Sequence, residues 1–184
     1  SYSLQDPWIQ QLMSNIHARG HEIGFHGSYG TFHDRQQLAE EFHSLLNAAK
    51  GLEIDQEQWG GRQHYLRWGA PFTWQDWEDA GLNYDSTLTF AEVAGFRCGV
   101  CFEYPVFNLE SRQPLQLMER PLIVMDQTVL SPKYMRLSDY EAYEAIRMLK
   151  ERCKLFSGEF TVLWHNNMLL TEASLALYRS LVLP

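Results

Sequence analysis

Apolar residues recur at intervals of three and four in several stretches of the chain, and this spacing is typical of amphipathic helices. The first stretch, between Asp6 and Gly20, has a capping residue and a proline at its start and a glycine at its end. Similar signals predict helices over about residues 35–50, 73–80 and 172–181, and a further helix that Ser138 caps.

Short runs of β-branched, aromatic and other apolar residues lie between these helices and predict strands. We expect strands over residues 21–26, 62–68, 84–89, 95–100, 122–126 and 160–164. Strands that alternate with helices are joined by crossover connections. The sequence therefore predicts an α/β fold with mostly parallel strands, arranged as a sheet or a barrel.

The chain is short for a complete barrel, which typically needs about 250 residues. It has 184 residues, and neither a repeat nor a linker divides it, so we expect a single domain over residues 1–184. The first predicted element is a helix with no strand before it. We therefore expect a distorted, incomplete (β/α) barrel whose N-terminal strand is missing from this sequence.

The composition and net charge restrict the classes of partner that we expect for this protein. Fifteen basic and 23 acidic residues give a net charge of −8, which argues against a duplex nucleic-acid binder, since phosphate affinity comes from clustered Lys and Arg. Apolar runs are far shorter than the ~20 residues that a transmembrane helix needs. Three cysteines are too few for a disulfide framework, and no charged-then-apolar leader is visible, so we expect a cytoplasmic protein.

Polar side chains that can do chemistry fall at the ends of four predicted strands. They are His26, the pair His64 and Arg67, Asp126, and His165. Because parallel strands bring their carboxyl ends to one edge, where the sites of α/β proteins form, we expect these side chains to form a site. The alternative for each histidine is a structural role in a hydrogen bond.

Residues 62–68 place Arg62, His64 and Arg67 in one strand-like segment. Burying such groups is costly unless they face an anion or a cavity, and an anionic transition state or a metal-held carboxylate would be such a partner. The alternative is an edge strand exposed to water. His165 follows a very apolar strand, where an imidazole is suited to proton transfer near neutral pH, or else packs against Trp164.

Cys98 and Cys101 have the two-residue spacing of thiol redox sites. A thiol oxidoreductase would require a helix that begins at Cys98, whereas we expect a strand or a loop there. A structural zinc site would require a second pair of this kind. We therefore expect two small core residues.

Three motifs, in order along the chain, resemble those of the polysaccharide deacetylase family (carbohydrate esterase family four). Residues 20–26 read Gly-His-Glu-Ile-Gly-Phe-His, and residues 62–65 read Arg-Gln-His-Tyr, with His64 where the family usually has proline. Residues 163–165, Leu-Trp-His, are similar to the family's final Leu-x-His motif. The chain resembles a divergent branch of this family, which is associated with bacterial O-antigen and surface-polysaccharide biosynthesis.

This resemblance implies a hydrolase that removes an N-acetyl or O-acetyl group from an acetylated sugar or polysaccharide with a divalent metal ion, first of all zinc. It implies His26 as a metal ligand and His165 as the catalytic histidine, with Asp126 as its partner ahead of Asp85. The further roles that follow from it are His64 as the second metal ligand, Arg62 as a catalytic residue, and Tyr29, Tyr65 and Arg67 as substrate-binding residues.

Two departures from the family pattern leave an alternative open. The family's opening Asp-Asp motif has no counterpart here, and the usual position of the second ligand histidine holds Gly30. His64 replaces that ligand only if its side chain meets His26. Otherwise we expect a deacetylase-fold protein that binds carbohydrate without turning it over.

Overall fold

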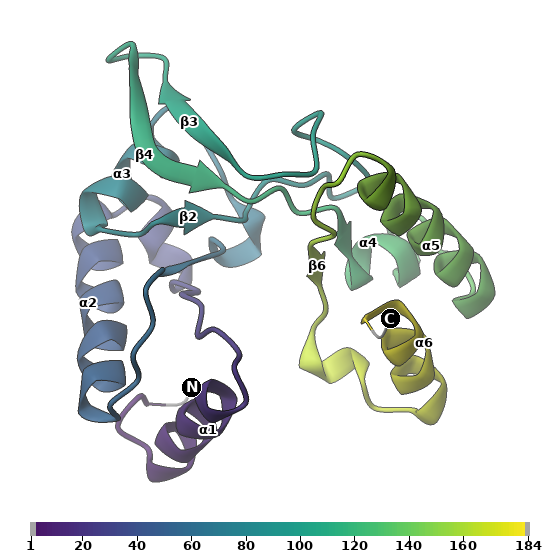
Figure 1. The fold of residues 1–184 in the computed structure, drawn as a ribbon, viewed down its shortest axis with the longest axis horizontal. Helices are drawn as coiled ribbons and strands as arrows, with labels where there is room; N and C mark the ends of the chain where they lie inside the picture. The colour runs from purple at the N-terminus through teal and green to yellow at the C-terminus, as the bar shows by residue number, and fades with distance from the viewer. Residues whose placement is uncertain (1–2, 183–184) are drawn as a thin grey trace. The chain divides into compact units, whose positions relative to one another are not determined.

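The computed structural model describes residues 3–182 (Figure 1). It shows a mixed α/β fold with a mostly parallel sheet. The chain divides into two compact units. The first contains the described residues up to Thr87 together with Pro105–Glu119, and the second contains Leu88–Tyr104 and the described residues from Arg120 onward.

The larger sheet has four strands in the order β1 (Gly60–Gly61), β2 (Tyr84–Asp85), β4 (Gln113–Glu119) and β3 (Tyr104–Asn108). β1 pairs with β2, and β2 with β4, in parallel, while a short turn joins β3 to β4 (Figure 1). Phe25 adds one parallel bridge to Gly61. The register therefore aligns one row of residues across the sheet: Phe25, Gly61, Asp85 and Glu119.

The two glycines of β1 allow their neighbours to approach closely. A Cβ atom on Gly61 would overlap the backbone of Phe25, and one on Gly60 would overlap Tyr84. Phe25 N donates to Gly60 O at 2.8 Å, and Arg62 N donates to Phe25 O at 3.0 Å. No other residue type leaves room for this pairing.

Three predicted helices of the first unit are confirmed. They are α1 (Pro7–Ala18), α2 (Arg35–Gly51) and α3 (Phe72–Ala80). Asp6 caps α1, as its sequence predicts, and Gly81 ends α3 in the left-handed region at φ 93°. Phe25 meets Phe42 of α2 and Trp77 of α3 edge to face, at centroid distances of 5.6 and 5.9 Å, so these rings pack the helices against the bridging segment.

The described residues of the second unit form a parallel pair of strands and three α-helices. The strands are β5 (Val124–Met125) and β6 (Val162–Leu163), and the helices are α4 (Asp126–Leu130), α5 (Asp139–Leu155) and α6 (Glu172–Val182). Ser138 and Glu141 form a capping box at the start of α5, which confirms the predicted cap. Ile146 of α5 and Leu177 of α6 belong to one buried cluster with Ile123. No helix in residues 3–182 has the length and apolar character that crossing a bilayer requires.

Two predicted strands are wrong. Over residues 62–68 the backbone leaves the sheet after Gly61, and His64–Leu66 forms a short 3-10 helix, η2. The Gln63 N–H there donates to Thr87 Oγ1 at 2.9 Å, a side chain, instead of extending the strand ladder. Residues 95–100, all described, form turns and bends, with Gly95 and Gly99 at positive φ.

The remaining strand predictions differ in extent. Of residues 21–26 only Phe25 pairs, and β2, β5 and β6 each have two residues. The sequence prediction missed β3 and β4, in which Val106, Leu115 and Leu117 alternate with exposed positions. That alternation is the signal of a half-buried strand, but Pro105 and Pro114 favour loops in a prediction from sequence.

We predict that Gly61→Ala lowers the free energy of unfolding by about 1–3 kcal/mol, the usual cost of forcing atoms into a packed site. Gly51→Ala is the matched control, because nothing lies within 4 Å of a Cβ atom there, and its effect should stay below about 1 kcal/mol. Urea unfolding of both variants measures the difference. Equal stabilities would contradict the steric role of Gly61.

Candidate functional site

Two of the residues predicted to form the site, His26 and His64, lie in contact. His26 directly follows the row residue Phe25, and His64 is the first residue of η2. His64 Nδ1 lies 3.2 Å from His26 Nε2, and His26 Nδ1 lies 2.9 Å from Arg62 O. Because a carbonyl oxygen only accepts, His26 carries its proton on Nδ1, and its Nε2 lone pair faces His64.

The spacing of these two nitrogens fits two ligands of one metal ion. Nitrogens at 2.0–2.1 Å from a tetrahedral zinc ion lie about 3.3 Å apart, close to the 3.2 Å between His26 and His64. The bond from His26 Nδ1 to a backbone carbonyl is the arrangement that orients metal-binding histidines. Within residues 3–182, however, no three His, Cys, Asp or Glu side chains are grouped to hold a metal ion.

Two exposed aromatic rings lie beside the histidine pair. Tyr29 is 61% exposed and Tyr65 77% exposed, with their ring centroids 6.0 Å apart and the planes nearly perpendicular. Tyr65 lies 4.7 Å from the ring of His64, and Tyr29 lies 6.1 Å from it. Rings exposed in this way are suited to stacking on the apolar face of a sugar.

Arg67, predicted to bind substrate, holds the segment that carries Tyr29. Its guanidinium carbon lies 4.3 Å from the ring centroid of Tyr29 and 4.2 Å from that of Phe32. One N–H group donates to Tyr29 O at 2.9 Å, and another contacts His33 Nε2. The guanidinium group of Arg67 therefore contacts other residues of the protein. Phe32 is one of them, and the sequence analysis had assigned it no role.

Arg62, predicted to be catalytic, contributes to this region through its backbone and its charge. Its N–H and C=O groups bond to Phe25 and His26, as described above. Its positive charge lowers the pKa of Asp85, a neighbour that the sequence offered only as the second candidate partner of His165.

Two carboxyl groups are fully buried on neighbouring strands of the first unit. Asp85 of β2 pairs in register with Glu119 of β4, and both are 0% exposed. Trp74 Nε1 donates to Glu119 at 3.1 Å, and Thr87 donates to Asp85 Oδ1 through its N–H and its hydroxyl. Asp85 Oδ2 has no hydrogen bond in the described chain. Burial raises the pKa of Asp85 to about 7, against the opposing effects of Thr87 and Arg62.

The second unit holds an aspartate–histidine dyad, formed by two residues that were both predicted to be catalytic. His165 Nδ1 lies 2.7 Å from Asp126 Oδ1, and the His165 backbone N–H donates to Asp126 Oδ2 at 2.7 Å. Gln127 N–H adds a third bond to this carboxylate at 2.6 Å. Asp126 is fully buried, whereas the His165 side chain is 43% exposed. The carboxylate therefore fixes Nδ1–H, and Nε2 is the nitrogen that can exchange protons.

The cysteines do not form the arrangement that a thiol redox site requires. Cys98 lies in a turn, with no helix beginning there. Burial, with a contribution from neighbouring Cys101, raises the pKa of Cys153 to about 12. Cys153 is therefore a poor nucleophile, and the turn at Cys98 disfavours the oxidoreductase hypothesis, which requires a helix there.

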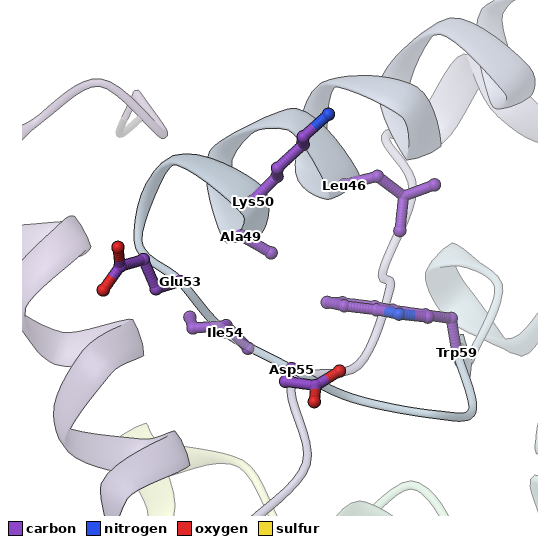
Figure 2. A pocket seen from close by; sticks show the side chains of 7 residues that line it. All are labelled: Leu46, Ala49, Lys50, Glu53, Ile54, Asp55 and Trp59. Carbon is purple, nitrogen blue, oxygen red and sulfur yellow. The ribbon is translucent and has the colours of Figure 1, made fainter.

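A pocket of about 300 Å³ lies at the C-terminal end of α2 (Figure 2). Leu46, Ala49, Ile54 and Trp59 give it an apolar lining, and the remaining lining residues are Lys50, Glu53 and Asp55. Trp59 directly precedes β1, so the pocket lies at the amino end of the parallel strands, whereas His64 follows their carboxyl end. Sites of parallel α/β sheets form at the carboxyl end, and the candidate site is therefore the histidine pair.

Comparison with protein-family models and with curated proteins finds no match for this chain.

We predict that Asp85→Asn removes a pH dependence of stability. The pKa of Asp85 rises from 3.8 to about 7 on folding, so the folded state binds this proton more tightly. The resulting stability is fully present below about pH 4 and is lost as the pH rises through about 7, by at most ~1.4 kcal/mol per pH unit.

Urea unfolding between about pH 5 and 8 measures this effect. The wild type should lose stability relative to Asp85→Asn as the pH rises. Parallel curves for the two proteins would show that burial does not shift the pKa of this carboxyl group.

Proposed function

We propose that this protein is a metal-dependent hydrolase of the polysaccharide deacetylase type, which removes an N-acetyl or O-acetyl group from a sugar in bacterial surface-polysaccharide biosynthesis. The contact between His26 and His64 is the observation that carries the proposal. It supports the hypothesis that His64 takes the place of the second ligand histidine, whose usual position in the family holds Gly30. The motifs at residues 20–26, 62–65 and 163–165 add the resemblance.

His26 Nε2 and His64 Nδ1 would hold the divalent ion, with zinc the first candidate. A bound ion of this kind polarises the acetyl carbonyl and lowers the pKa of a water molecule. Arg62 O keeps the proton of His26 on Nδ1, so Nε2 is the nitrogen of this ring that would bind the ion. One of the two ligand nitrogens would therefore be oriented before an ion binds.

The resemblance assigns to His165 the role of supplying the proton that the leaving amine or alcohol needs. Asp126 accepts a hydrogen bond from Nδ1–H and fixes the orientation of the imidazole. The exposed Nε2 can then take a proton and give it up again. General acid–base catalysis of this kind contributes a factor of roughly 10² to 10⁴ in rate.

Tyr29 and Tyr65 would recognise the sugar ring by stacking, and Arg67 would keep Tyr29 in place. The proposal includes a distorted, incomplete (β/α) barrel as the fold, which the mostly parallel pairing supports. It also includes the cytoplasm as the compartment, which suits a sequence with only three cysteines.

The second candidate is a carbohydrate-binding protein without turnover. The absence of a third grouped ligand in residues 3–182 favours it. Exposed Tyr29 and Tyr65 would serve such a protein equally well. The two candidates differ in whether an ion binds and whether acetate is released.

The first test of the hydrolase is metal content. We expect about one equivalent of zinc per chain after loading and dialysis, and its loss in His26→Ala and in His64→Ala, because each variant removes one nitrogen ligand. His43→Ala, an exposed histidine of α2, is the control and should retain the metal. Mass spectrometry measures the ratio. A wild-type chain without metal would exclude this mechanism and favour the binding protein.

The second test is acetate release from acetylated amino-sugar oligomers. We expect His165→Ala to lower kcat by roughly 10²- to 10⁴-fold without loss of zinc, because it removes the proton donor but no ligand. Asn167→Ala, which changes a neighbouring exposed side chain, should retain the activity. A His165→Ala variant with wild-type kcat would remove this residue from the mechanism.

A further inference from the structure

Four buried polar residues of the first unit connect the two segments that carry the candidate site. They are Thr31, Gln63, Asp85 and Thr87, which are at most 2% exposed, and we call them the polar clamp. Buried groups of this kind are costly unless their hydrogen bonds are satisfied. The hydrogen bonds of these four residues therefore indicate which backbone segments they keep in place.

The first half of the clamp fixes the segment of His64. Asp85 Oδ1 accepts hydrogen bonds from the N–H and the hydroxyl of Thr87. With its proton so directed, the Thr87 oxygen accepts from Gln63 N–H at 2.9 Å. Gln63 lies between Arg62, whose carbonyl orients His26, and His64 itself. The Asp85 carboxyl group thus acts on both imidazoles through one hydroxyl group.

The second half of the clamp fixes the segment of Tyr29. The single proton of the Thr31 hydroxyl has two acceptors within reach, Ser28 O at 2.8 Å and Gln63 Oε1 at 3.2 Å. Tyr29 lies in the 3-10 helix η1 (Tyr29–Phe32), between Ser28 and Thr31 in the sequence. Gln63 therefore joins the two segments, through its backbone on one side and its side chain on the other.

The segment after Gln63 has a backbone that needs such support. Tyr65 and Leu66 have φ values of 56° and 52°, in the left-handed region, which is unusual for bulky residues. Conformations of this kind persist where the surroundings determine them. The clamp and the bond from Leu66 N to Gln63 O, at 2.9 Å, are surroundings of that kind.

We propose that the polar clamp is the positioning element of the His26–His64 pair, with Asp85 acting through Thr87 and Gln63. The inference rests on the proposed function for the metal-binding role of the pair. The positioning itself concerns the two imidazoles with or without an ion, so it can be tested separately.

The test compares Thr87→Val, which removes the hydroxyl at nearly constant volume, with Thr87→Ser, which keeps it. In the 184-residue chain, nitrogen-15 NMR of the imidazoles without metal should show the Nδ1–H form of His26 in the wild type and in Thr87→Ser. Thr87→Val should lose it. Zinc affinity, measured by calorimetry, should fall about 10- to 100-fold in Thr87→Val only, as is usual when a supporting contact of a ligand is removed.

Leu45→Ala is the matched control for stability, because Leu45 is a buried core residue of the same unit and is not a member of the clamp. Its imidazole signals should stay those of the wild type. Should Thr87→Val not fold, Asp85→Ala against Asp85→Asn gives the same comparison, since asparagine retains the acceptor oxygen. Unchanged signals in the folded clamp variants, or an equal change in Leu45→Ala, would overturn the inference. Changed signals in a chain that binds no zinc would support the clamp and refute the hydrolase.

Discussion

The candidate site depends on one steric constraint, the absence of a side chain at Gly61. Without a Cβ atom there, the backbone of Phe25 can pair with β1, and the row of aligned residues can extend to Asp85 and Glu119. Parallel strands that share a register also end together, so the residues that follow the row leave the sheet at one edge. That is why His26 and the segment after Gly61 meet, with their imidazole nitrogens 3.2 Å apart.

In the second unit, too, polar residues that follow neighbouring parallel strands come into contact. β5 and β6 run in parallel, and the polar residues just beyond them are Asp126 and His165. The carboxylate accepts two backbone N–H groups as well as the imidazole, which compensates for its complete burial. The result is a histidine with one nitrogen committed to the protein and one available for chemistry. An orienting carboxylate and an exposed ring are what proton transfer requires.

The buried carboxyl group of Asp85 contributes more to the arrangement of the nearby backbone than to the stability of the first unit. Asp85 has an oxygen without a hydrogen bond, and burial holds its pKa near 7, so its ionised form is unfavourable in the folded state. Its bonds to Thr87 nevertheless align the backbone at Gln63. A polar network of this kind specifies one arrangement of two loops. Both an enzyme and a sugar-binding protein would need that arrangement, because each depends on the placement of Tyr29 and His64.

The five-residue α4 was not predicted, but the sequence by itself determined the longer helices, because their signals are local: Asp6 and Ser138 cap α1 and α5, and apolar residues recur within each of the longer helices. It also predicted which side chains carry chemistry, and His26, His64, Asp126 and His165 all take part in the two contacts described above. Only the tertiary structure decided which of them meet, and that the segment after Gly61 turns away from the sheet. The physical reason is that strands here are as short as two residues, and strand pairing joins residues far apart in the chain, so register follows from packing and leaves no local pattern.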